Sequence, residues 1–140
     1  MASETITRND LQAILNEVLP SAATDYIVEQ GTSGIWTYRK WNSGIAECWG
    51  AKAISVSSWA TWGTWYYISA TGDAYPTNLF TTVYSVQGSI SSGAGDTISS
   101  IADRPSNLSV TAPKITAVRP SAGSTSTNGY AFWHTIGRWK

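Results

Sequence analysis

Residues 31–50 read GTSGIWTYRKWNSGIAECWG, a stretch in which three tryptophans and the only cysteine of the chain stand between glycines. The Ser-Gly pair at 43–44 divides the stretch into two runs without helical periodicity, which predicts a β-hairpin. Trp36 and Tyr38 fall on one face of the first strand, whereas Trp41 falls on the other. Large rings on both faces of a strand indicate burial between a sheet and a second surface, such as the next subunit.

The β-type pattern continues outward from this hairpin, from residue 25 to the C-terminus. Runs rich in β-branched and aromatic residues are separated by turn residues, and no helical pattern intervenes. This spacing predicts a mainly β fold, an antiparallel, jelly-roll-like β-sandwich. We expect strands at residues 26–29, 35–41, 45–56, 64–69, 79–87, 108–112, 115–118 and 130–138.

Alternation along two of these strands predicts which side chains share a face. The Asn-Gly pair at 128–129 predicts a turn just before the last strand. Two Ser- and Gly-rich segments, 88–107 and 121–128, are expected to be loops. The side chains expected to share a face are Phe80, Thr82, Tyr84 and Val86 in one strand, and Tyr130, Phe132, His134 and Ile136 in the last.

Upstream of the sheets, residues 5–20 (TITRNDLQAILNEVLP) are the one convincing helix. Thr7 can cap this helix, Asp10 favours its positive end, and Pro20 stops it. Read as a heptad repeat, the helix favours association of three or four strands, although it can also fold back onto its own domain. We expect a trimerisation collar at 1–22 and a β-sandwich head at 23–140. The apolar stripe expected at the trimer interface is Leu11, Ile14, Leu15, Val18 and Leu19.

The composition excludes several classes of partner. Nine basic and nine acidic residues cancel, so no global field attracts the chain to nucleic acid. No apolar run is long enough for membrane insertion, and the polar N-terminus lacks the apolar segment of a signal peptide. Charged residues make up only 13%, which is typical of a surface buried in an assembly or built from neutral hydrogen-bonding groups.

The residues that carry catalysis or bind metals are too few to form a recognisable site. One histidine and one cysteine cannot form a transition-metal site within a chain, and no calcium motif is present. Cys48 is expected to be a small buried thiol. His134 is expected to be a sheet residue with a hydrogen-bonded partner, although a threefold axis can also gather three copies of it around a metal. Glu47 and Asp73 are the conceivable glycosidase acids, but their context singles out neither. We therefore expect no enzyme and no cofactor.

The segment SSWATWGTWYYIS at 57–69 carries more aromatic surface than one face of a strand can bury. These rings pack in the core, pack against another subunit, or contact a ligand. Sugars stack on exposed aromatic faces, whereas nucleic-acid stacking is disfavoured because no basic stripe accompanies the rings. The candidate ligand-binding residues are Trp59, Trp62, Trp65, Tyr67 and Tyr75.

Three segments carry a family resemblance. The glycine-flanked run at 31–50, the helix TRNDLQAILNEVLP at 7–20 and the closing TIGRWK at 135–140 resemble small tail-fibre or tail-tip proteins encoded by phages and prophages of Gram-positive gut bacteria. The region from about 51 to 128 is similar only in its alternation of strands and loops.

The resemblance implies a homotrimeric, non-enzymatic component of the phage tail, made in the bacterial cytoplasm and assembled into the virion. It implies docking to another tail or baseplate protein and contact with a host cell-surface saccharide or polymer. Two other classes stay open, which are a purely structural tail or baseplate decoration and a bacterial carbohydrate-binding module.

Overall fold

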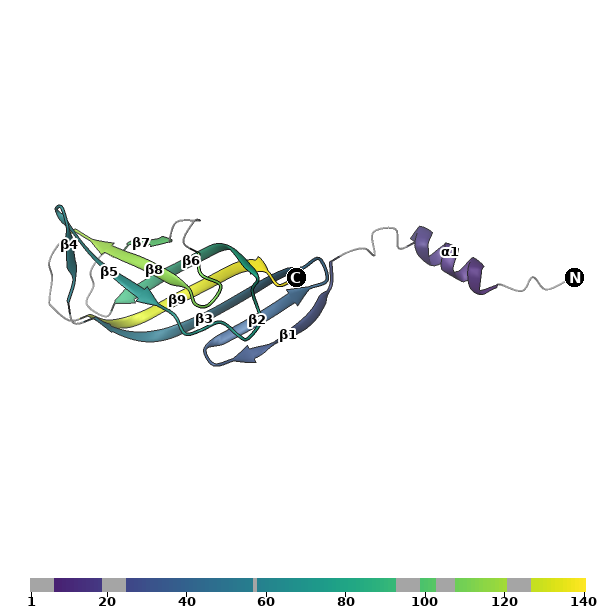
Figure 1. Ribbon diagram of the computed structural model, residues 1–140, viewed down its shortest axis with the longest axis horizontal. Helices are drawn as coiled ribbons and strands as arrows, with labels where there is room; N and C mark the ends of the chain where they lie inside the picture. Colours follow the sequence, from purple (N-terminus) through teal and green to yellow (C-terminus); the bar gives the residue numbers. More distant parts are fainter. Residues whose placement is uncertain (1–6, 19–24, 57, 93–98, 103–107, 121–126) are drawn as a thin grey trace, which may run out of the picture.

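The structure is a computed structural model that describes residues 7–18, 25–56, 58–92, 99–102, 108–120 and 127–140. Within these ranges the fold is mainly β, with one short helix and two antiparallel sheets (Figure 1). The helix is α1(Arg8–Val18). The five-stranded sheet has the order β1(Ile27–Ser33), β2(Trp36–Trp41), β3(Ile45–Val56), β9(Thr127–Arg138), β6(Thr82–Ser92). The four-stranded sheet has the order β4(Ala60–Trp62), β5(Trp65–Thr71), β8(Lys114–Arg119), β7(Ser99–Ala102).

The hairpin predicted at the centre of the 31–50 stretch is confirmed. β2 and β3 pair from Trp36 opposite Gly50 to Lys40 opposite Ala46. Gly44 closes the turn at φ 96°, a conformation that costs glycine little, and its N–H donates to the carbonyl oxygen of Trp41 at 3.0 Å. The predicted bounds of β3, residues 45–56, are those of the structure.

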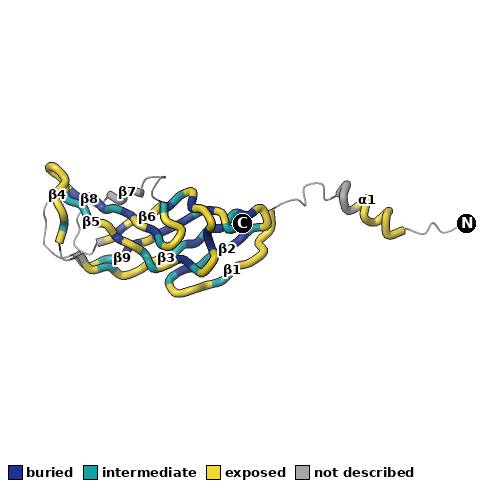
Figure 2. The backbone as a smooth tube through the Cα atoms, viewed as in Figure 1, coloured by how far each residue is buried: buried dark blue, intermediate teal, exposed yellow. Residues whose placement is uncertain are grey.

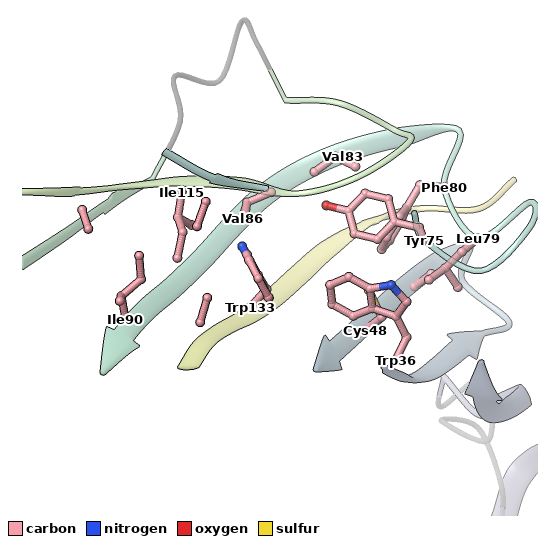
Figure 3. Packing of buried hydrophobic residues seen from close by; sticks show 14 of the residues in the cluster. Trp36, Cys48, Tyr75, Leu79, Phe80, Val83, Val86, Ile90, Ile115 and Trp133 are labelled. Atoms are coloured by element: carbon pink, nitrogen blue, oxygen red, sulfur yellow. The ribbon is translucent and has the colours of Figure 1, made fainter. Parts of the chain in front are cut away.

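One hydrophobic core lies between the two sheets, which gives them a sandwich-like arrangement (Figure 3). The five-stranded sheet contributes Trp36 and Trp133 to this core, and the four-stranded sheet contributes Ile115. The Trp36 indole donates from Nε1 to the carbonyl oxygen of Ala74 at 2.9 Å, whereas the buried Nε1 of Trp133 has no hydrogen-bond partner among the described residues. The jelly-roll connectivity stays a prediction.

The face expected for the strand at 79–87 is wrong because β6 contains a bulge. The pairing with β9 shifts register between Val83 and Ser85. Val83 and Val86 are therefore both buried, whereas Tyr84 is exposed. One extra residue in a strand reverses the alternation that follows it, so Tyr84 does not share a face with Val86.

The alternation predicted for the last strand is confirmed, and the side that carries Tyr130 and Phe132 is the outer one. Tyr130 and Phe132 are exposed, while Ala131 and Trp133 are buried. The predicted turn at 128–129 is wrong, because Asn128 and Gly129 already pair with Ser55 and Ile54 of β3. The neighbouring long strand of the same sheet recruits these residues despite their turn propensity.

Other boundaries also differ from expectation. Residues 108–112 form a loop, in which the Ser109 hydroxyl accepts the N–H groups of Thr111 and Ala112, and β8 starts only after Pro113. The expected loop at 88–107 is partly strand, because β6 continues to Ser92 and β7 follows at Ser99. The expected loop at 121–128 lies mostly outside the described residues.

The helix begins as the sequence predicts. Thr7 donates from its N–H and its hydroxyl to the Asp10 carboxylate at 2.9 and 2.5 Å, and the Asp10 N–H returns to the Thr7 hydroxyl at 3.2 Å. These bonds, the side-chain bond first, lower the pKa of Asp10. No described strand packs extensively against α1, which stands apart from the sheets. Leu11 and Ile14 are accordingly about half exposed, and the coloured part of α1 is drawn as exposed (Figure 2). Leu19, the side chains of Leu15 and Val18, and the expected boundary at 22–23 lie outside the described residues.

Candidate functional site

Three of the candidate rings come together on the β4–β5 hairpin. Gly63 opens its two-residue loop with φ 61°, a conformation that glycine adopts readily. Trp62 and Trp65 face each other across the loop, and Ala60 pairs with Tyr67. Because directly opposite residues of an antiparallel pair share a face, Trp62, Trp65 and Tyr67 lie on one side of the hairpin. The exposed fractions of Trp62 and Trp65 are 64% and 47%.

Tyr67 is the ring of this group that lines a groove of about 670 Å³, whose walls come from both sheets. It lies where strand pairing stops. β2 pairs only with residues 46–50 of β3, and β4 pairs only with residues 65–67 of β5. The rest of each strand therefore has an edge without a partner strand among the described residues. Such edges present backbone N–H and C=O groups that can bind a polar ligand.

Trp59 lies in this groove and is held from one side by a buried arginine. The guanidinium carbon of Arg119 is 4.0 Å from the centroid of the Trp59 ring, and Arg119 is only 1% exposed. A cation stacked on an indole at this distance is attractive and fixes the plane of the ring. The Nε1 of Trp59 has no hydrogen-bond partner among the described residues.

The walls of the groove are rich in hydroxyl groups and balanced in charge. Ser55, Ser58 and Ser69 line it together with Tyr67. Among the described residues, Lys52 is the charged one that lines it, and Lys52 Nζ bonds Asp73 Oδ1 at 2.5 Å. An aromatic floor with hydroxyl groups and no unpaired charge suits a neutral, polyhydroxylated ligand.

A second hollow lies on the outer side of the same hairpin. Its volume is about 340 Å³, and it is lined by Thr61, Trp62, Tyr67 and Thr116. Tyr67 lines this hollow as well as the groove. The two sites therefore form one surface of rings and hydroxyls.

Tyr75 does not belong to this surface. It is 7% exposed, and its ring lies 5.5 Å from that of Trp36 and 4.9 Å from that of Phe80. Its hydroxyl contacts the Thr135 hydroxyl at 3.1 Å, and burial raises the pKa of Tyr75. The structure thus places this candidate ligand residue in the core.

Arg119 and the two open strand edges are the features that sequence reasoning missed. An arginine that ends a strand before a proline gives no sign of which ring it will stack on. Unequal strand lengths, from which the groove arises, become evident only once the partners of each strand are known.

The candidate catalytic residues have structural partners. Cys48 is fully buried, and burial raises the pKa of its thiol to about 12. His134 Nε2 bonds Glu47 Oε2 at 3.0 Å, as expected of a sheet histidine, and Asp73 is paired with Lys52. Within the described ranges no three His, Cys, Asp or Glu side chains gather to hold a metal ion. No helix in the described part of the chain is long and apolar enough to cross a membrane.

Comparison with known proteins finds similarity at the level of the fold alone. No protein-family model and no curated protein sequence matches the chain. An N-truncated R1-type pyocin tail fibre has a similar fold, with a TM-score of 0.55 and 14% identity, over 98% of this chain and 99% of that one. A C-terminal part of the P. aeruginosa R1 pyocin fibre has a TM-score of 0.52 and 16% identity over 79% of this chain, which spans only 28% of that fragment. The chain therefore shares the fold of pyocin tail-fibre fragments.

Proposed function

We propose that this chain is the head or tip of a phage-type tail fibre, a homotrimer that contributes to attachment to saccharide on the host surface. The observation that carries the proposal is the similarity to the N-truncated R1-type pyocin tail fibre, which extends over 98% of this chain and 99% of that one. A match over nearly the whole of both chains supports a shared overall architecture.

The helix supports self-association. Leu11 and Ile14 lie on one stripe of α1, about half exposed in the single chain. An eleven-residue helix is marginal in water without a partner for its apolar side. Packing three copies of α1 around an axis would bury this stripe, with Leu11 and Ile14 at the a and d positions of a heptad.

The ring surface supports saccharide binding. Trp62 and Trp65 are exposed on the same side of the hairpin as Tyr67, and Tyr67 lines a groove rich in serine hydroxyls. Pyranose rings stack on such faces, and their hydroxyls bond neighbouring polar groups. The proposed role is binding without cleavage, which is supported by the partners of the two candidate acids: Glu47 lies 3.9 Å from Arg39, and Asp73 bonds Lys52.

The protein would then be made in the bacterial cytoplasm and reside in the virion tail, docked to another tail or baseplate protein. The host group stays the prediction made from the sequence, Gram-positive gut bacteria. Two alternatives remain, which are a structural tail or baseplate decoration without its own receptor and a bacterial carbohydrate-binding module.

A glycan array and whole bacterial cells, both probed with the labelled full chain, test the attachment. We expect binding that falls at least about tenfold, a loss of ~1.4 kcal/mol, in the Trp62→Ala, Trp65→Ala double variant. Tyr26→Ala is the matched control, because Tyr26 is also an exposed ring (57%) but lies outside the ring surface. Undiminished binding of the double variant would contradict the assignment of the site. A trimer that binds no glycan and no cell would favour the decoration, and a monomer that binds glycan would favour the bacterial module.

A further inference from the structure

We propose that the outer face of the five-stranded sheet is a second self-association surface, on which the corresponding head of another copy packs. This face carries Trp49, Tyr84, Tyr130, Phe132 and Ile136, on the side of the sheet turned away from the core. The inference rests on the proposed homotrimer and extends it from α1 to the head.

The first argument is exposure. Tyr84, Tyr130 and Phe132 are 50%, 55% and 45% exposed, whereas Trp133, on the inner face of the same sheet, is 2% exposed. The rings of Tyr130 and Phe132 lie 6.4 Å apart, so these two side chains form one exposed patch. Grouped exposed rings of this kind mark an interaction surface. Among the described residues, the four-stranded sheet covers only the inner face.

The second argument is charge. The charged groups in the middle of the outer face are already matched within the chain. Glu47 bonds His134 at 3.0 Å and lies 3.9 Å from Arg39, and the Arg39 guanidinium stacks 5.0 Å from the centroid of the Trp49 ring. Covering this face therefore strands no carboxylate without a counter-charge, which is the usual cost of burying a charged surface. A partner with little net charge and many rings suits it, and the same face of a second copy is such a partner.

The third argument is chain length. The nine Cα–Cα steps from Val18 at the end of α1 to Ile27 at the start of β1 span at most about 30 Å. Ile27 pairs with Trp41 at the edge of the five-stranded sheet. If α1 associates around an axis, each head is held within this distance of the end of its own helix, so the tethers allow two heads to separate by no more than about 60 Å plus the spacing between the helices. The local concentration of one head near another then makes a second copy the favoured occupant.

Thiol labelling reports directly on whether the outer face is covered. Ser89 pairs with Phe132 on this face and is exposed. Ser69 is its matched control, an exposed strand serine that lines the groove instead. The native thiol, Cys48, is fully buried and contributes little background. Ser89→Cys and Ser69→Cys would be labelled with a maleimide in the full chain over a range of protein concentrations.

We expect the Ser89→Cys thiol to react at least tenfold more slowly than the Ser69→Cys thiol while the chain is associated, and the two rates to converge on dilution. Equal rates in an associated chain would overturn this inference and leave the proposed trimer intact. A chain that is monomeric at every concentration would overturn both. Protection that persists when sedimentation shows a single chain would assign the cover to a segment of the same chain, and so overturn the inference as well.

A second pair of variants removes the dependence on labelling. Phe132→Glu places a charge on the outer face. Trp65→Glu is the control, because it places the same charge away from that face, at a ring position of similar exposure (47% for Trp65, 45% for Phe132). With folding checked by circular dichroism, we expect the dissociation concentration in sedimentation equilibrium to rise at least tenfold for Phe132→Glu alone. Equal dissociation of the two variants would contradict the proposal.

Discussion

Two tryptophan-rich stretches of this chain look alike in sequence and have opposite roles in the structure. Trp36, in the stretch at 31–50, is 1% exposed, whereas Trp62, in the stretch at 57–69, is 64% exposed. The difference lies in their neighbours. β2 has a partner strand on either side, while β4 is a three-residue strand at the end of its sheet. Position in the sheet therefore decides whether a ring stabilises the fold or is available for contacts.

Replacing the two tryptophans tests this comparison with the largest expected effect. Trp36→Ala should lower the free energy of unfolding by about 3–5 kcal/mol, because it leaves a cavity between the sheets. Trp62→Ala should change it by no more than about 0.5 kcal/mol, as is usual for a surface substitution. Urea unfolding followed by circular dichroism measures both. Similar losses for the two variants would contradict the contrast.

The hydroxyl pair in the core should give the next largest effect. Thr135 is fully buried, and its hydroxyl contacts that of Tyr75. Thr135→Val should cost about 1–3 kcal/mol, because it leaves the Tyr75 hydroxyl buried without this partner.

Adding Tyr75→Phe to Thr135→Val is the control, since it removes the stranded hydroxyl. The double variant should recover part of the loss in the same urea measurement. Tyr75→Phe is also measured alone. If the double variant loses as much free energy of unfolding as Thr135→Val and Tyr75→Phe lose together, the contact between the two hydroxyls does not stabilise this part of the core.

A smaller, pH-dependent effect is expected at the edge of the five-stranded sheet. Hydrogen bonds from Lys40 at 2.8 Å and Tyr38 at 2.9 Å lower the pKa of Glu29. A lowered pKa in the folded state contributes stability at neutral pH that is lost as the pH falls through the glutamate range.

The expected sign is therefore that acid destabilises the wild type more than Glu29→Gln. Urea midpoints of the two proteins at neutral pH and at about pH 3.5, below the ordinary glutamate pKa, measure the difference. Equal acid sensitivity would mean that the Glu29 contacts do not contribute.

The smallest effect is expected at Cys48, whose thiol should not react with a maleimide while the chain is folded. With its pKa raised to about 12 by burial, the thiol should stay unlabelled by a maleimide at neutral pH and react once urea unfolds the chain. Fast labelling under native conditions would indicate that the 31–50 stretch opens readily, and would weaken its contrast with 57–69.

Much of the fold could be predicted from the sequence where local signals agree with the final pairing. The turn at Gly44, the bounds of β3 and the Thr7–Asp10 cap depend on neighbouring residues only. The face of β6 could not be predicted, because a bulge at Tyr84 depends on the register with β9. The start of β9 at Thr127 likewise depends on the length of β3.

The candidate site was predictable to a similar extent. Trp62, Trp65 and Tyr67 lie together because one hairpin carries them all. Tyr75 lies elsewhere, because the loop that bears it folds into the core. Arg119 follows Trp59 by 60 residues in the sequence, so their stacking arises from tertiary packing and from no local pattern.

The central claim is that the apolar surfaces left exposed on a single chain are covered by further copies. Sedimentation equilibrium of the full chain tests it most directly. We predict a mass three times that of the 15.1 kDa chain, which falls towards that of one chain when Leu11 and Ile14 are both replaced with Asp. A mass of one chain at every concentration would contradict the account.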